Sequence, residues 1–426
     1  MFDDVIEASG LGNFSHTELE LSNGAKVILK QTDFKKDQVL LRSEGFGGSA
    51  LYGEKDFANI KMFDDVIEAS GLGNFSHTEL EKALAGKIAG ATLTLGANRV
   101  HVNGSSTPKD VETMLQLAYL YFTNIAKDQK SYDNLMQTTE VQLKNRLLQP
   151  ESVLQDSLTA TLTGHNPRNK ALKTEDLAKV SYDRIMEMAK EQTANAAAFT
   201  FTIIGNYDEE SIRGLIETYL ASLPAQKKVV KSPNVSTIFK GEVINNFKHK
   251  GESPKAYAVM EWYSKELPLT AENDIKMDMI GQVLSMEYLK KIREDASAAY
   301  TVQAMAGIDR NDFETTAQVL AVCPMKPEKA DTAIMILRDE VTALARTCDA
   351  DKLQKVKEYM LKEHGNQLKQ NGYWLSVINT WRKHGIDIHN DYEKLVNAQT
   401  PESISAFMAE VLKAGNRAEV VMLPAE

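Results

Sequence analysis

The spacing of apolar residues predicts an ordered series of strands and helices along the first half of the chain. Alternation with a period of two predicts strands, and recurrence every three to four residues predicts helices with one buried face. The Asn23-Gly24 pair between two alternating runs is typical of a hairpin turn. The predicted strands are 19–29 (the hairpin), 38–51, 91–107 and 199–205, and the predicted helices are 55–69, 76–86, 108–126, 131–148, 170–193 and 209–223.

The same series of elements starts again in the second half. Each half runs strands, helix, strands, helices and strand, which indicates one α+β unit used twice with diverged sequence. We therefore expect two homologous domains, each a mainly antiparallel sheet packed by helices, rather than a doubly wound parallel sheet. The predicted strands are 256–264, 298–308, 315–324 and 417–426, and the predicted helices are 272–295, 327–346 and 349–370.

A linker separates the two halves. Residues 225–240 lose the apolar periodicity and gain Lys, Ser and Pro. We expect a first domain over 19–224 and a second over 241–426. The length of 426 residues also favours two domains, because single cores seldom grow beyond about 250–300 residues.

The first twenty residues, MFDDVIEASGLGNFSHTELE, recur without a difference at residues 62–81. The second copy completes the helix predicted at 55–69, and its Ser76 and Glu79 form a capping-box pair that begins the next helix. The first copy lacks the residues that begin the helix. Because natural repeats drift apart, this identity indicates a recent duplication or an artefact, and we expect residues 1–18 not to be part of the fold.

Composition excludes several classes of protein. The net charge of −10 disfavours binding to a phosphate backbone, which needs clustered Lys and Arg, so we expect no nucleic-acid partner. No apolar run approaches the ~20 residues of a membrane helix, so we expect no membrane insertion. The N-terminus shows no signal-peptide pattern. The two cysteines form no disulfide framework, and Cys323 in an apolar run is expected to be a buried thiol.

Motifs that would identify a reaction are absent from the sequence. Phosphate-binding glycine loops and the G-x-S-x-G elbow do not occur. A helical zinc site needs two imidazoles one turn apart, whereas the nearest pair of the eight histidines, His384 and His389, is separated by a glycine and lacks an intervening Glu. We therefore predict no metal site and no catalytic residue in this chain.

One local cluster remains as a candidate binding site. Arg293 lies at the end of an amphipathic helix, and Tyr300 begins an alternating strand seven residues later. A guanidinium and a phenol at a helix-to-strand corner can both donate hydrogen bonds to carbonyl oxygens. The alternative is structural, because Arg near a helix C-terminus interacts favourably with the helix dipole and Tyr is common in strands.

Several segments together resemble the pitrilysin (insulinase-type) zinc metallopeptidases over roughly residues 19–424. The segments LSNGAKVILKQTDFKKDQV and SEGFGGSALYGEKD resemble the entry of a family half. The segment FTIIGNYDEESIRGLIETYLASLP resembles the end of its first domain, and NGYWLSVINT and REDASAAY resemble parts of its last domain. The resemblance implies homologous α/β domains arranged as two halves around a chamber, with zinc held by an H-x-x-E-H helix in the N-terminal half.

The chain departs from the family at the zinc helix. The helix in the corresponding place reads EKDFANIKMFDDVIEAS and contains no histidine, while the downstream helix has Glu140 but no second ligand. The departure matches the C-terminal, non-zinc-binding half of the family. The resemblance then implies that Arg293 and Tyr300, in the R-x6-Y arrangement of that half, bind a carbonyl of the peptide substrate in the chamber.

The resemblance sets the expected function and its alternatives. We expect an inactive half that closes the chamber and binds peptide substrates for a zinc-bearing N-terminal half, in the same polypeptide or a separate subunit. The alternative within the same fold superfamily is a non-catalytic scaffold or assembly subunit. A free-standing metal enzyme would need ligands that this chain does not offer. Relatives with this layout are often exported, which favours the periplasm or cell envelope.

Overall fold

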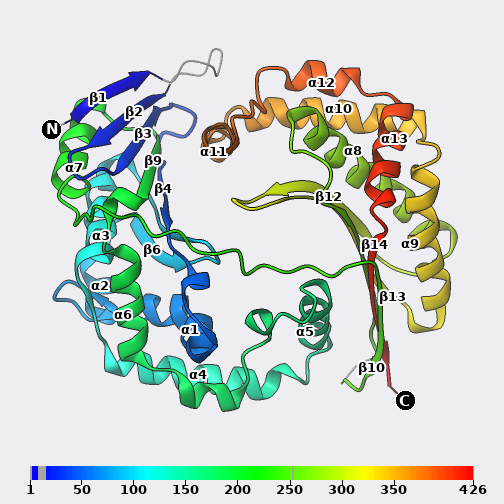
Figure 1. Ribbon diagram of the computed structural model, residues 1–426, viewed down its shortest axis with the longest axis horizontal. Coiled ribbons are helices and arrows are strands. Elements are labelled where there is room, and N and C mark those ends of the chain that lie inside the picture. The colour runs from blue at the N-terminus through cyan, green and yellow to red at the C-terminus, as the bar shows by residue number, and fades with distance from the viewer. Residues whose placement is uncertain (1, 8–15, 252–253, 426) are drawn as a thin grey trace. The chain divides into compact units, whose positions relative to one another are not determined.

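The structure is a computed structural model that describes residues 2–7, 16–251 and 254–425. The chain forms two compact units (Figure 1). The first unit consists of Met1–Lys144, Leu172–Val235 and Lys369–Ile378, and the second consists of Asn145–Ala171, Ser236–Leu368 and Asn379–Glu426.

The first unit contains a seven-stranded sheet with the order β1-β2-β3-β9-β4-β7-β6 and a small ladder of β5 and β8. Only β3 and β9 run parallel in the large sheet. Its elements are β1 Phe2–Glu7, β2 Thr17–Leu21, β3 Lys26–Gln31, β4 Val39–Phe46, α1 Phe57–Glu68, β5 Gly71–Leu72, α2 His77–Ala83, β6 Ala89–Leu95, β7 Arg99–Ser106, α3 Val111–Thr123, β8 Ile125–Ala126, α4 Gln129–Arg146, which crosses the boundary of the unit, α6 Tyr182–Thr193, β9 Phe199–Gly205 and α7 Glu209–Tyr219.

The second unit contains a five-stranded sheet with the order β10-β14-β11-β13-β12, in which only β10 and β14 run parallel. Its elements are α5 Pro150–Leu162, β10 Glu242–His249, β11 Ala256–Ser264, α8 Ala271–Tyr288, β12 Gln303–Arg310, β13 Thr315–Met325, α9 Ala330–Leu344, α10 Ala350–Gln367, α12 Tyr392–Ala398, α13 Pro401–Lys413 and β14 Asn416–Pro424, while α11 Asn371–His384 begins in the first unit and ends in the second.

The two sheets share one topology. In the second unit the five strands, numbered along the chain, lie in the spatial order 1-5-2-4-3, with the parallel pair formed by the first and fifth. Strands β3, β4, β6, β7 and β9 of the first unit repeat this order and the same parallel pair, and β2 and β1 are added outside β3. This confirms the expected duplicated α+β unit with a mainly antiparallel sheet.

Each sheet buries an apolar face under helices. In the first unit Phe63 of α1 and Leu115 of α3 pack with strand residues such as Phe201. In the second unit Met279 of α8 and Leu337 of α9 lie in the corresponding core, which also holds the buried thiol of Cys323 as expected. Because successive strand side chains point to opposite faces, the other face of this sheet forms a separate cluster. That cluster joins Val259, Val420 and Met422 to Leu154 of α5.

The path of the chain is less simple than two consecutive domains. The boundary at residues 235/236 falls inside the expected linker, and the described residues 225–240 form neither helix nor strand. Two segments, however, belong to a different unit from the one that the expected domain boundaries predicted. Residues 145–171, which include α5, lie with the second unit, and residues 369–378 lie with the first. A hydrogen bond helps to hold residues 369–378 in the first unit: the Thr32 hydroxyl donates to the side-chain oxygen of Asn371, at the start of α11, at 2.6 Å.

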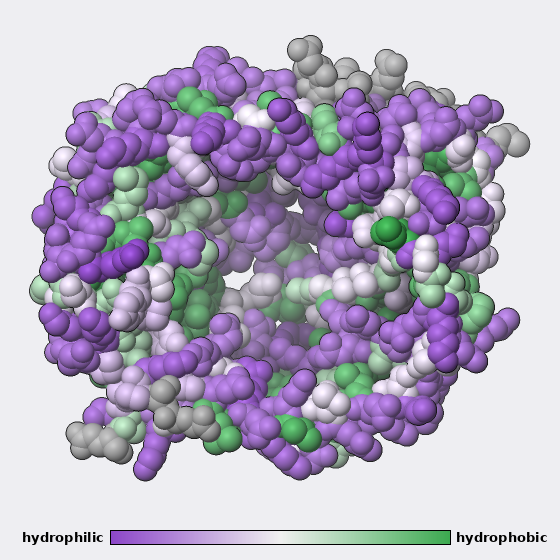
Figure 2. Space-filling model, turned by 180° about the vertical axis from the view of Figure 1, so that it is seen from behind, coloured by the Kyte–Doolittle hydropathy of each residue, from purple (hydrophilic) through white to green (hydrophobic). Residues whose placement is uncertain are grey.

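The face of the molecule drawn in Figure 2 is mostly polar. Figure 2 shows hydrophilic residues over most of the face that it presents, with apolar residues scattered between them. Within the part of the chain that the structure describes, no helix is both long and apolar enough to cross a membrane.

The two identical segments form different structures. The letters FDDVIE form strand β1 at residues 2–7, paired with β2, whereas at 63–68 they form the second half of α1. The structure therefore differs from the expectation that residues 1–18 lie outside the fold, since it places 2–7 and 17–18 in the sheet; residues 8–15 are outside the described residues. Tertiary context overrides intrinsic propensity here, because only the second copy is preceded by a helix start.

We expect deletion of residues 1–15 to leave the melting temperature nearly unchanged. Among the described strands β1 pairs with β2 at the edge of the sheet, so its loss leaves the other strand pairs of the first unit intact. Thermal unfolding followed by circular dichroism measures the effect. A loss of several degrees would show that β1 is part of the cooperative fold.

Candidate functional site

Helix α1 occupies the place where the resemblance puts zinc ligands, and its residues do not fit the metal. Its apolar residues Phe63 and Ile67 are buried in the core, and its exposed face carries Asp64, Asp65 and Glu68 but no imidazole or thiolate. The Asp64 carboxylate accepts a hydrogen bond from the Leu95 backbone N–H at 2.8 Å, which ties the helix to the edge strand β6. Across the described residues, no group of three or more His, Cys, Asp or Glu side chains is placed to hold a metal ion.

The predicted pair Arg293 and Tyr300 lies on the connection between α8 and β12. Helix α8 continues into a π-helical turn, Leu289–Asp295, which carries Arg293. The chain then reverses at Ser297, whose φ of 50° is unusual for a residue other than glycine. Strand β12 begins only at Gln303, so Tyr300 lies before the strand rather than at its first position as the sequence suggested.

Both predicted side chains are available to a ligand. Arg293 is exposed, and the side chain of Tyr300 is 83% exposed. Neither makes a hydrogen bond or an ion pair with any residue that the structure describes; the ring of Tyr300 lies 5.9 Å from the Lys326 ammonium. The structure thus places both residues on one connection with their side chains exposed, and their role in binding stays a prediction.

The neighbours of the pair hold this corner in place. The hydroxyl of the buried Tyr288 donates a hydrogen bond to the Leu337 carbonyl at 3.0 Å. The Lys291 ammonium lies 2.6 Å from the buried carboxylate of Glu340 on α9. The Lys329 ammonium donates to the Ala296 carbonyl at 3.1 Å. Anchoring on both sides fixes the backbone that carries Arg293.

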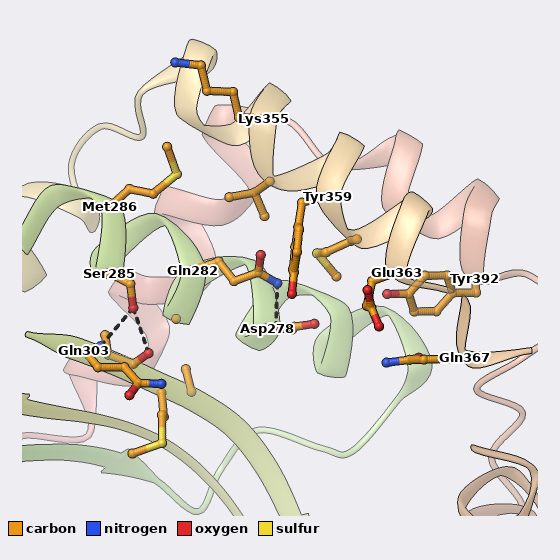
Figure 3. Close-up of a pocket in the computed structure, with 16 residues that line it drawn as sticks. Asp278, Gln282, Ser285, Met286, Gln303, Lys355, Tyr359, Glu363, Gln367 and Tyr392 are labelled. Atoms are coloured by element: carbon orange, nitrogen blue, oxygen red, sulfur yellow. Dashed lines mark hydrogen bonds between the residues drawn. The ribbon is translucent and has the colours of Figure 1, made fainter. Parts of the chain in front are cut away.

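A groove lies beside the same helix and strand in the second unit (Figure 3). It has a volume of about 660 Å³ and is lined by α8, the start of β12, α10 and Tyr392. Figure 3 shows the side chains of Tyr359 and Glu363 on α10 facing Asp278 and Gln282 on α8. The lining residues on the two helices are Asp278, Gly281, Gln282, Ser285 and Met286 of α8 and Lys355, Val356, Tyr359, Met360, Glu363 and Gln367 of α10.

Sequence reasoning missed this groove, although a signal for it exists. Lys355, Tyr359, Glu363 and Gln367 recur every four residues along one face of a predicted helix. Residues spaced by four lie on the same helix face, so a mixed polar and aromatic row marks a face that is not buried in the core. The facing row on α8 comes from a segment about eighty residues earlier, and only the fold brings the two rows together.

The groove carries an excess of negative charge. The walls of the groove displace water around the Asp278 carboxylate and raise its pKa, although its side chain reaches solvent. Burial and then the charge of Asp278 raise the pKa of Asp274, one turn away on α8, to about 6. Burial, together with these two carboxylates, also raises the pKa of Tyr392 to about 12. Burial is the main cause of these shifts, and the smaller contribution from the neighbouring carboxylates indicates that negative charge is concentrated here.

A further titratable carboxylate lies on the opposite face of the second sheet. Glu261 of β11 is paired with Ala418 and Leu320 and is only 7% exposed. It makes no hydrogen bond or ion pair with any described residue, and burial raises its pKa to about 7. Ionised Glu261 is therefore an unfavourable buried charge in the folded chain.

We expect Glu261→Gln to stabilise the chain increasingly as the pH rises above about 4.5, with the full effect above about pH 7. Below about pH 4.5 Glu261 is protonated in both states. Between about pH 4.5 and 7 the unfolded state releases the proton first, so the free energy of unfolding falls as pH rises. Urea unfolding should show a gain of up to about 3 kcal/mol for the variant at pH 8 and almost none at pH 4.5. Glu266→Gln, at an exposed position, is the control; an equal gain at both pH values would contradict the assignment.

Comparison with known proteins finds a family match in the middle of the chain. Residues 179–360 match the family described as Peptidase M16 inactive domain. The match covers the end of the first unit and the α8–β12 corner with Arg293 and Tyr300. The resemblance to the C-terminal, non-zinc-binding half of a pitrilysin-type zinc metallopeptidase is thus confirmed.

The chain is homologous to PqqL-like zinc proteases. It is 22% identical over 376 residues to "Zinc protease PQQL-like" of Arabidopsis thaliana, a match that covers 85% of this chain and 37% of the relative. It is 21% identical over 343 residues to "Probable zinc protease PqqL" of Escherichia coli (strain K12), covering 80% of this chain and 36% of the relative. The chain therefore spans under half the length of these curated relatives.

A solved structure shows the same fold. The crystal structure of the periplasmic protease PqqL from Escherichia coli superposes with a TM-score of 0.83 and 19% sequence identity. The superposition covers 100% of this chain and 47% of that protein. The expected fold class is confirmed by this likeness.

Proposed function

We propose that this chain is the inactive C-terminal half of a zinc metalloendopeptidase. In this role it closes the proteolytic chamber and helps to bind the peptide that an N-terminal half cleaves. The observation that carries the proposal is helix α1, which has no metal ligands in a chain that matches only 36–37% of two zinc proteases. The part of these two relatives that this chain does not match is long enough to form a second half that carries the zinc.

Arg293 and Tyr300 are the proposed substrate-binding residues. The Arg293 guanidinium presents a planar fork of N–H donors. The Tyr300 hydroxyl supplies a neutral donor seven residues later. Together they bind a backbone carbonyl oxygen of the peptide, with stronger hydrogen bonds if negative charge develops on that oxygen. When present in the other half, zinc supplies the activation of water and carbonyl that this chain cannot provide.

The proposed partner and location follow from the relatives. The partner is a zinc-bearing N-terminal half, in the same polypeptide or as a separate subunit. The relative from Escherichia coli is described as a periplasmic protease, which supports a periplasmic location for this chain.

Complementation tests the proposal. The chain and the N-terminal half from the same genome are purified separately and assayed, alone and mixed, with a fluorogenic peptide library. We expect cleavage only in the mixture, because one half lacks zinc and the other lacks the carbonyl donors. Cleavage by this chain alone, or full activity of the N-terminal half alone, would refute it.

A further inference from the structure

We propose that the groove between α8 and α10 binds an extended peptide through one lysine or arginine side chain, which lies beside Tyr359 and Tyr392 and pairs with Asp278 and Glu363. The inference rests on the proposed function, since it assigns a preference to the peptide that the chain binds. It adds a second contact region to the Arg293 and Tyr300 corner.

The two carboxylates are free to pair with a cation from outside. Asp278 accepts a hydrogen bond from the Gln282 amide at 2.9 Å, and Glu363 accepts a 3.3 Å contact from the Asn366 amide. Among the residues that the structure describes, neither has a cationic partner. Lys355 is the basic residue of the lining, and it lies eight residues from Glu363, or about 12 Å along the helix at 1.5 Å per residue.

The aromatic lining suits an ammonium or guanidinium group. The side chain of Tyr359 is 57% exposed although it stands over the groove, so its ring is available to a ligand. Tyr392 is fixed by stacking on His364, with ring centroids 4.1 Å apart. A cation beside tyrosine rings is attracted by their π-electrons in addition to the carboxylates.

The ligand is held by side chains and not by strand addition. The Ser285 hydroxyl lies 2.9 Å from both the backbone nitrogen and the carbonyl oxygen of Ala304, so it occupies the outer edge of β12. Farther along, Gly281 allows α8 to approach so closely that an added Cβ would lie 2.9 Å from the Ala306 nitrogen. The edge of β12 within the groove is therefore closed to another strand.

The size and place of the groove favour a peptide over a free amine. A volume of about 660 Å³ exceeds what one side chain needs and accommodates a short peptide segment. The end of the groove at Gln303 begins three residues after Tyr300. A peptide whose carbonyl oxygen accepts a hydrogen bond from the Tyr300 hydroxyl can thus extend toward the groove.

Fluorescence anisotropy tests the inference with the full chain alone. The probes are the labelled heptapeptide GAAKAAG and its counterpart GAAQAAG, which differ only in the central side chain. We expect the lysine peptide to bind at least about tenfold more tightly at low salt, and Asp278→Asn with Glu363→Gln to abolish that preference. Glu358→Gln removes one charge from the same helix outside the groove lining and should change affinity less than about twofold.

A second variant keeps the inference testable if the double substitution disturbs folding. Gln282→Glu adds a carboxylate to the groove and should strengthen binding of the lysine peptide. Equal binding of the two peptides, no loss in the double variant, or competition by spermidine as effective as by unlabelled lysine peptide would each overturn the inference. Because no cleavage is measured, these outcomes are independent of the complementation assay that tests the proposed function.

Discussion

In the complete two-half protease, Arg293→Ala is expected to lower kcat/KM for peptide cleavage about 100-fold, the typical effect of removing one preorganised donor to a developing oxyanion. Because Arg293 is exposed and has no hydrogen-bond partner among the described residues, the substitution should not alter the fold. Arg293→Lys should also lower kcat/KM by most of this factor, since a point charge does not replace the planar fork.

The control for this prediction is Arg346→Ala, which removes the same charge from an exposed site on the same unit. It should leave kcat/KM within about twofold of the parent enzyme. Cleavage of a fluorogenic peptide by the reconstituted enzyme gives both values. If the Arg293→Ala enzyme works at the normal rate, Arg293 does not bind the reacting peptide.

The second large effect concerns the stability of the second unit, where Arg338→Met is expected to cost about 3 kcal/mol of unfolding free energy. Arg338 on α9 forms two hydrogen bonds, of 2.8 and 2.6 Å, with the Glu419 carboxylate on β14. Glu419 is fully buried, so the substitution leaves an unpaired charge inside the protein. The hydrogen bond to Glu419 also raises the pKa of Arg338, as expected for a paired cation.

A double substitution separates this cause from a simple loss of packing. Arg338→Met combined with Glu419→Met removes both charges and should recover most of the lost free energy in urea unfolding. If the double variant is less stable than the single one, the loss arises from packing and not from the unpaired carboxylate.

Many element types could be predicted because they depend on local patterns, although the predicted elements did not include β10, α5, α11, α12 or α13. The capping box of Ser76 and Glu79 is present at the start of α2, and the turn at Gly24, with a φ of 80°, joins β2 and β3. The repeated order of strands and helices also indicated the duplicated unit. Each of these features is decided by residues close in sequence.

The partners of each element could not be predicted in the same way. Helix α5 was not among the predicted elements, and its residues alone do not show that Leu154 packs on the second sheet rather than the first. The FDDVIE segments show the same limit, since identical letters form a strand in β1 and a helix in α1. Periodicity shows which face of an element is buried, whereas long-range contacts determine which other element that face packs on.

The sequence predicted part of the candidate site and missed the rest. The spacing of Arg293 and Tyr300 pointed to one corner, and the structure leaves both side chains exposed there. The spacing did not reveal the π-helical turn that carries Arg293 or the reversal of the chain at Ser297 before Tyr300. The groove was missed because its charges, on Asp278 and Glu363, come from helices that only the fold brings together.

The zinc content of the purified chain tests the central claim most directly. The chain is expressed alone, equilibrated with a small excess of zinc, dialysed and analysed by mass spectrometry for metal bound per polypeptide. Because α1 carries no histidine and the described residues contain no metal-binding group, zinc should be far below stoichiometric. One zinc ion per chain, retained through dialysis, would contradict its assignment as the half without the metal.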